Sequence, residues 1–248
     1  NNAIKLQKTE ADGTVTRWGW KMPTWRNWVP IIWGHGADFV DSWTDPTRFT
    51  GNTSQMHDAL NFMHSLVETG AITPQAEHGR KGASTAFIDQ TNAMVNTNTV
   101  VMPLFKSITD FEWDVAPAPY GPAGRKPFFN ALAWVMLSGA KNKEATWRVI
   151  NFMTSERAQT IMVDILGVVP PDRRYAQYWV RLHETPLNRA VLFDELDTAG
   201  YPGTLEVDLY RILETETLTA TWGTKPVSAA IETMQQLANV RLRELAEW

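Results

Sequence analysis

The sequence predicts a mixed α/β fold, because short strand-like segments are separated by amphipathic helices along most of the chain. Residues 14–22 alternate in polarity and are rich in β-branched and aromatic residues, as a half-buried strand requires. Residues 53–70 repeat apolar side chains at helical spacing. Segments rich in proline and glycine, at 113–127 and 167–174, interrupt this pattern. Their composition predicts connectors between two lobes.

The elements of the N-terminal half follow one another closely. A helix is predicted over residues 25–33, where two glycines follow the last apolar position. The helix over 53–70 is the clearest in the chain, because a Thr-Ser pair can cap its amino end and a glycine ends it. A short helix and a strand over 93–95 come next, before a polar turn at 96–99.

The C-terminal half is predicted to be mainly helical. Residues 113–127 begin as a strand and become a connector, and 128–137 read as a second strand. A largely buried helix is expected over 143–166, broken near Ser155. The remaining chain reads as four helical segments, over residues 175–185, 187–199, 205–222 and 226–248.

The composition excludes several classes of protein. The chain has 248 residues, a net charge of −4 and no cysteine, so disulfides, thiolate metal sites and cysteine nucleophiles are absent. It contains no long block of lysine and arginine, which argues against nucleic acid or anionic membrane surfaces as partners. No uninterrupted apolar run is long enough for a membrane span. The first residues show no signal-peptide pattern and read as the middle of a protein, from which a signal was removed or the chain cut.

The sequence contains no recognisable arrangement of catalytic residues. The five histidines lack metal-ligand spacing, and neither a GxSxG elbow nor a phosphate-binding loop is present. Carboxylates gather at 193–200 and 205–210, where a suitably spaced pair would suit glycoside hydrolysis. A solvated helix face explains them more simply. We therefore predict no catalytic residue, no metal site and no cofactor.

Tryptophan is the unusual feature, with twelve residues in the chain and a cluster between 18 and 43. An indole face suits the C–H face of a sugar ring or a quaternary cation. Most of the cluster is expected to be core. Trp25 and Trp28 differ because they follow a strand end, where ligands of open α/β sheets bind, so pocket and core both stay open for them.

A sequence of motifs points to one family. The segments "WGHGADFVD", "STAFIDQTNAMVNTNT", "WDVAPAPYGPAG" and "SGAKNKEATW" occur in this order within roughly residues 14–245. Together they resemble the extracellular solute-binding proteins of ABC importers, in the group of maltose-, multiple-sugar- and glycerol-phosphate-binding proteins. Each motif is loose by itself, and their order carries the resemblance.

The resemblance implies a periplasmic-binding-protein-like type II fold with two α/β lobes. Residues 1–116 and 167–248 would form the C-terminal lobe, and 117–166 would return to the N-terminal lobe. The family carries a further segment before this point, which builds most of the N-terminal lobe. The strand 128–137 would then lack neighbours, and we expect its apolar faces to be covered by a missing N-terminal fragment, a second copy or a rearrangement.

The resemblance also implies a ligand site in the cleft between the lobes. Its positions fall on Trp25, Trp28, Asn98, Thr99, Asn130 and Arg173. The family often has a glycine and an aromatic residue where this chain has Asn98 and Thr99, so an ordinary turn stays open there. For Arg173 a plain surface charge stays open as well. Trp25 and Trp28 should be partly exposed, and Trp18, Trp20 and Trp33 more buried.

The function implied is that of a non-enzymatic, substrate-binding component that delivers a sugar, oligosaccharide or related polyol to the permease subunits of an ABC importer. It would act in the periplasm or outside the cell, either free or lipid-anchored through a preceding segment. A carbohydrate-active enzyme or accessory domain is the alternative class. Quaternary amines and glycerol phosphate are alternative ligands, because an aromatic cage also binds cations.

Overall fold

The computed structural model describes residues 2–22, 25–129, 133–167, 169–182, 185–201, 203 and 205–247. The chain divides into two compact units, each built from separated segments. Unit 1 comprises Asn1–Thr97, Ala118–Phe129 and Glu195–Trp248, and unit 2 comprises Asn98–Pro117 and Asn130–Asp194. No described helix has the length and apolar character needed to cross a membrane.

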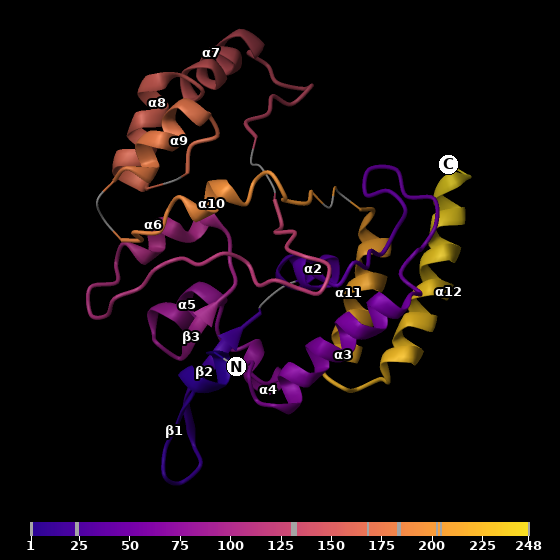
Figure 1. The fold of residues 1–248 in the computed structure, drawn as a ribbon. Coiled ribbons are helices and arrows are strands. Elements are labelled where there is room, and N and C mark those ends of the chain that lie inside the picture. The colour runs from indigo at the N-terminus through magenta and orange to yellow at the C-terminus, as the bar shows by residue number, and fades with distance from the viewer. Residues whose placement is uncertain are drawn as a thin grey trace. The chain divides into compact units, whose positions relative to one another are not determined.

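Unit 1 contains a small sheet in the order β1-β2-β3 (Figure 1). β1 (Lys8–Thr9) pairs antiparallel with β2 (Val15–Lys21), and β2 pairs parallel with β3 (Asn92–Val95). Helix α1 (Asn2–Leu6) lies so close to β2 that a Cβ added at Gly19 would come within 2.0 Å of the Ala3 carbonyl oxygen. The strands predicted at 14–22 and 93–95 are confirmed.

The predicted helices of the N-terminal half also form. α2 spans Trp25–Gly34 and α3 spans Ser54–Glu68, followed by the short helices α4 (Gln75–His78) and α5 (Ala83–Ile88). Thr53 is the N-cap of α3, and its hydroxyl accepts a hydrogen bond from the Met56 amide at 3.2 Å. The capping residue and the apolar spacing therefore predicted correctly where this helix starts and which of its faces is buried.

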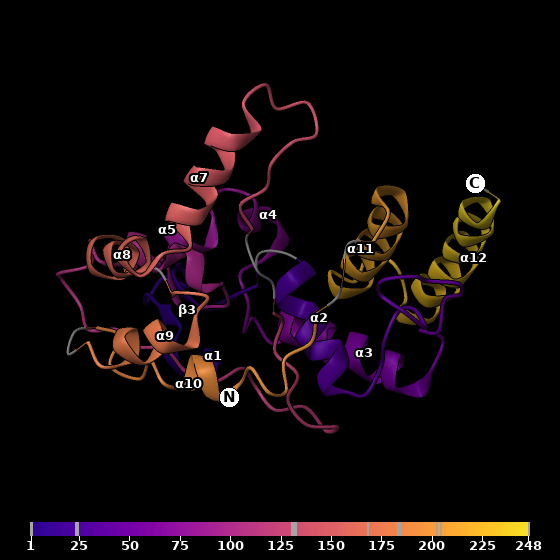
Figure 2. The ribbon, with the colours of Figure 1, turned by 90° about the horizontal axis from the view of Figure 1, so that it is seen from above.

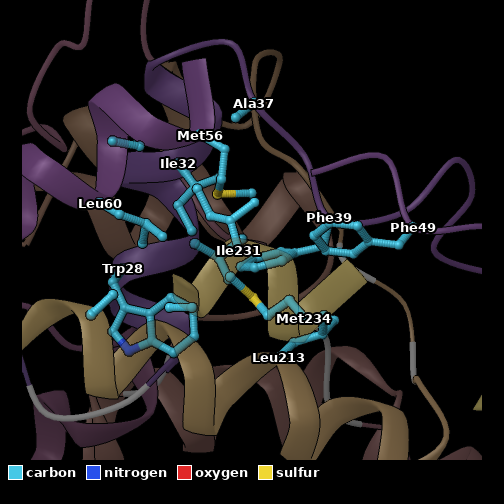
Figure 3. Close-up of a cluster of buried hydrophobic side chains, with 14 of the residues drawn as sticks. Trp28, Ile32, Ala37, Phe39, Phe49, Met56, Leu60, Leu213, Ile231 and Met234 are labelled. Atoms are coloured by element: carbon cyan, nitrogen blue, oxygen red, sulfur yellow. The ribbon is translucent and has the colours of Figure 1, made fainter. Parts of the chain in front are cut away.

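The core of unit 1 lies between four helices. α11 (Val207–Thr221) and α12 (Val227–Ala246) pack against each other and against α3, and α2 joins them from the sheet side (Figures 2 and 3). The largest apolar side chains that are almost wholly buried here are Trp28, Ile32, Phe39, Met56, Leu60, Met63, Leu209, Leu213, Ile231 and Met234. Burying so many large side chains is the main source of this unit's stability.

Unit 2 is built from short helical pieces. They are η1 (Thr99–Val101), α6 (Met102–Phe105), α7 (Lys143–Met153), α8 (Glu156–Ile161), the π-helical turn η2 (Met162–Leu166), α9 (Arg173–Val180) and α10 (Val191–Asp194). Trp179 is its largest fully buried side chain. Its indole N–H donates to the Gly167 carbonyl at 3.0 Å, and the Arg189 guanidinium lies 4.6 Å from its ring centroid.

The strand expected at the start of 113–127 and the strand expected over 128–137 are not formed within the described residues. Phe128 makes only a single bridge with Gly200, and residues 133–137 form no strand and are exposed. Residues 130–132 lie outside the described residues. A strand needs a neighbour to receive its backbone hydrogen bonds, and the described chain brings none to 133–137.

The long helix expected at 143–166 is broken as predicted, because Ser155 caps α8 by accepting a hydrogen bond from the Ala158 amide. Its expected burial is wrong for α7, whereas Ala158 and Val163, beyond the break, are buried. No described residue of α7 is buried, and Trp147 and Phe152 are 51% and 49% exposed. The apolar positions follow helical spacing, but the contacts between α7 and α8 leave the large side chains of α7 about half exposed.

Candidate functional site

The predicted site begins where α2 follows the carboxyl end of β2. Trp25 is the first residue of α2, but its side chain lies outside the described part of the chain, as does the whole of Asn130. The nearest described polar group on this strand end is Lys21, which is 2% exposed. Burial lowers the pKa of the Lys21 ammonium, and the charge of Glu77 partly offsets this effect.

Trp28 is not partly exposed, contrary to the prediction. Its side chain is 2% exposed and packs edge-on against Phe39, with the ring centroids 6.3 Å apart (Figure 3). The reason is helical phase: Trp28 and Ile32 are one turn apart on the face of α2 that meets the core. Trp33 is buried as expected, at 6% exposure, whereas Trp18 and Trp20 are only partly buried.

Asn98 and Thr99 lie at the start of η1, in unit 2. The Asn98 side-chain oxygen accepts a hydrogen bond from the Val100 amide at 3.1 Å and so caps this turn. The Asn98 side chain is exposed and that of Thr99 is partly exposed. A capping amide still has its NH₂ group available as a donor, so the turn and a ligand contact are compatible.

Arg173 is the first residue of α9, also in unit 2, and its side chain is exposed. The preceding Asp172 caps this helix by accepting from the Arg174 amide at 2.9 Å. Asp172 also forms an ion pair with the Arg174 guanidinium at 2.6 Å, which with the backbone contact lowers the pKa of its carboxyl. Arg173 thus sits beside a local charge pair on the surface of its unit.

Unit 1 also holds a partly buried carboxylate, that of Asp38, which the sequence did not single out. Asp38 accepts hydrogen bonds from the Trp43 indole N–H and the Phe39 amide, both at 2.9 Å. Burial raises the pKa of the Asp38 carboxyl, while these donors and the charge of Lys126 act in the opposite direction. Because both donors come from its own loop, Asp38 fixes the position of Trp43. Only the general preference of Asp for loop hydrogen bonds could have indicated this role.

The carboxylates weighed as hydrolytic residues have structural partners. Glu195 forms an ion pair with Arg125 at 2.9 Å and accepts a hydrogen bond from the Ala118 amide at 3.0 Å. Its side chain is 14% exposed. Among the described residues, no group of three or more histidine and carboxylate side chains can hold a metal ion. Because Glu195 is held in place by these two partners, it is a weak candidate for a catalytic residue.

Comparison with known proteins identifies the family. Residues 3–181 match the family of bacterial extracellular solute-binding proteins, which is more than half of the chain. The chain therefore belongs to that family, and the predicted resemblance is confirmed. The sequence matches no curated protein.

Solved structures agree with this assignment. The chain is similar to an ABC substrate-binding protein, Lmo0181, from Listeria monocytogenes in complex with cycloalternan (TM-score 0.78, 17% identity, covering 97% of this chain and 62% of that one). It is also similar to MalX from Streptococcus pneumoniae in complex with maltopentaose (TM-score 0.77, 17% identity, covering 97% and 66%). A third similar structure is MalE from Bdellovibrio bacteriovorus bound to maltotriose (TM-score 0.75, 19% identity, covering 98% and 64%).

These similarities show the fold. The chain shares the α/β architecture of two-lobe solute-binding proteins, which confirms the predicted fold class. It spans less than two thirds of the length of each of these three proteins.

Proposed function

We propose that this protein is the substrate-binding component of an ABC importer and that its ligand is a sugar or oligosaccharide. The observation that carries the proposal is structural: three similar proteins, each covering at least 97% of this chain, were solved with cycloalternan, maltopentaose and maltotriose. The family assignment supports a binding role rather than a catalytic one. It also favours permease subunits as partners and a periplasmic or extracellular location.

Trp25 is our principal candidate for the stacking residue. It opens α2 just beyond the carboxyl end of β2, which is parallel to β3, and open α/β sheets bind ligands outside such strand ends. An exposed indole at this place would offer a flat apolar surface to a sugar ring. The burial of Trp28 favours a supporting role, in which it anchors α2 to the core and so holds Trp25 in place.

The polar contacts are assigned to the remaining predicted positions. Asn98, Thr99 and Asn130 carry amide and hydroxyl groups that can both donate to and accept from sugar hydroxyls. Arg173 would add a charged donor. A solute-binding protein works by binding and releasing its cargo unchanged, so none of these residues needs a reactive pKa.

The test is isothermal titration calorimetry on the complete gene product with maltose, maltotriose and maltopentaose. Choline and glycerol phosphate are the competing ligands. Saccharide binding that Trp25→Ala weakens about thirtyfold, without a change in thermal stability, is the expected result. If the protein binds choline or glycerol phosphate but no saccharide, the proposed sugar ligand is wrong and the alternative ligand takes its place. Saccharide affinity that is the same in Trp25→Ala would remove Trp25 from the site.

The enzyme alternative is tested with the same saccharides. We expect no new reducing ends after prolonged incubation with maltopentaose, because Glu195 is held by Arg125 and Ala118. Hydrolysis that disappears in Glu195→Gln would overturn the binding-protein assignment.

A further inference from the structure

The segment 118–129, most of which lies in the predicted connector 113–127, is fastened to the carboxyl end of α2. The Ala123 amide donates to the Gly34 carbonyl at 2.8 Å. Gly121 lies directly against Gly34, so that a Cβ at position 121 would come within 2.2 Å of the Gly34 carbonyl oxygen and 2.4 Å of its carbonyl carbon. Backbone meets backbone at this point, and only glycine fits.

We call this contact between the connector and the carboxyl end of α2 the joint. Further contacts surround it. A Cβ at Gly36 would lie 3.2 Å from the Cβ of Ala123, so the chain beyond α2 also touches the connector. The Lys126 ammonium lies 4.6 Å from the centroid of the Trp33 ring, in the last turn of α2. Within the connector, the Gly121 amide donates to the Gly124 carbonyl at 2.8 Å and closes the turn.

The connector also pairs with the segment that begins at Glu195, where the chain re-enters unit 1. Glu195 binds both the Arg125 guanidinium, at 2.9 Å, and the Ala118 amide, at 3.0 Å. The backbones pair as well. The Gly200 amide donates to the Pro127 carbonyl, and the Gly200 carbonyl accepts from the Phe129 amide, both at 2.8 Å. Arg125 and Glu195 are 21% and 14% exposed, so water screens this pair only in part.

We propose that the connector 118–129 is rigid and moves as one body with α2, and that Gly121 and Glu195 are the positioning residues that make it so. α2 has 10 residues, and it carries Trp25 at one end and the joint at the other. At 1.5 Å per residue the two ends are about 15 Å apart. Bending of the chain between the units therefore occurs outside residues 118–129, and the joint sets the position of Trp25. Only this last consequence rests on the proposed function.

Hydrogen exchange measured by mass spectrometry or NMR on the complete gene product tests the rigidity. In the unaltered protein, the amides of Ala123, Phe129 and Gly200 should exchange at least a hundredfold more slowly than in an unstructured peptide. Gly121→Ala should speed their exchange at least tenfold. Gly139→Ala is the matched control, because a Cβ at Gly139 meets nothing within 4 Å. It should leave these rates unchanged.

Glu195→Gln is the second variant, in case Gly121→Ala fails to fold. It keeps the size of the side chain, removes its charge and should speed exchange of the Ala118 amide with little change at α3. Exchange at Ala118 and Ala123 that is as fast in the unaltered protein as in a free peptide would overturn the inference. So would unchanged exchange at these amides in both variants.

Titration with maltotriose separates this inference from the proposed function. If the joint positions Trp25, Glu195→Gln should weaken maltotriose binding at least fivefold, while Gly139→Ala binds as the unaltered protein does. Unaltered affinity in Glu195→Gln, with a mobile connector, would overturn the positioning role. A protein that binds no saccharide but shows a slowly exchanging connector would refute the proposed ligand and leave the rigidity standing.

Discussion

The two units bury their apolar side chains to very different degrees. In unit 1, Trp28, Leu60, Met63 and their neighbours on α2, α3, α11 and α12 form one continuous core. In unit 2, Trp179 is fully buried, whereas α7 has no buried residue. The helices of both units have apolar positions at helical spacing. What differs is whether another element covers them.

The difference shows that an amphipathic sequence predicts a helix but not the partner of its apolar face. We define the apolar arm as residues 133–137 together with the exposed apolar side chains of α7. Its large exposed members are Trp134, Val135, Met136, Leu137, Trp147, Val149 and Phe152. Exposed apolar side chains in such numbers usually mark an interaction site or an aggregation hazard.

The largest expected effect compares one tryptophan from each unit. Trp28→Ala removes an indole that is 2% exposed, and it should lower the free energy of unfolding by about 3–5 kcal/mol. Trp147→Ala removes one that is 51% exposed, and it should change the free energy by no more than about 0.5 kcal/mol. Guanidinium titration followed by far-UV circular dichroism measures both. Equal losses would show that α7 is covered in solution and would remove the contrast between the units.

The next effect should be confined to unit 2. Trp179→Phe keeps an aromatic ring but loses the hydrogen bond to the Gly167 carbonyl and leaves a void, which together should cost about 1–3 kcal/mol. Hydrogen exchange should accelerate in α8 and α9 and stay unchanged in α3 and α12. Acceleration throughout unit 1 would mean that the two units unfold as one cooperative body.

Substitutions in the apolar arm should have a smaller effect on stability but a clear effect on self-association. The double variant Trp134→Ser with Leu137→Ser should change the free energy of unfolding by less than about 1 kcal/mol, because both side chains are exposed. It should reduce light scattering at high concentration and the binding of a hydrophobic dye. Leu187→Ser is the control, since Leu187 is 73% exposed but lies outside the arm. If Leu187→Ser has the same effect, the arm has no special role in association.

The smallest expected effect is on the pH dependence of stability, and it concerns charged residues of unit 1. Hydrogen bonds from the Thr47 hydroxyl and backbone lower the pKa of Asp41 to about 2, and the Arg241 guanidinium lowers the pKa of Glu206 to about 2. A depressed pKa gives stability that is present above the unfolded pKa and lost as the pH falls through the folded one. Both contributions should therefore disappear between about pH 4 and pH 2.

Glu206→Gln checks the electrostatic prediction, because it should reduce the acid-induced fall of the melting temperature over the same range. Asp38 acts with the opposite sign. Burial raises the pKa of its carboxyl, so its protonation favours the folded state as the pH falls. If Glu206→Gln has the same acid profile as the unaltered protein, the ion pair with Arg241 is too well screened to matter.

The features that the sequence predicted correctly are local. The cap at Thr53 and the break at Ser155 depend on side chains within three residues of the backbone amides they bind. β2 and β3 were predicted from alternation and turn residues alone. The missing strand at 133–137 shows the limit of such patterns, because strand formation depends on a neighbour that the local sequence does not encode.

The site was harder to predict for the same reason. The helix over 25–33 was predicted correctly, but its phase alone does not say whether Trp28 faces a ligand or α11 and α12. The sequence does not reveal the partners of Asp38 and Glu195, and Glu195 meets Arg125 across 70 residues of chain. The family resemblance supplied Asn98, Thr99, Asn130 and Arg173, and these stay predictions until a ligand is bound.

The docked connector has a consequence for proteolysis. A protease must draw an extended segment of its substrate into its active site, so it cuts segments that can detach from the fold. Trypsin should spare the bond after Arg125, although it lies in a segment rich in proline and glycine, because residues 118–129 are fastened to α2 and Glu195. It should cut first after Lys141 or Lys143, beside the apolar arm. A brief digest would then leave unit 1 as an intact body made of separate chain segments.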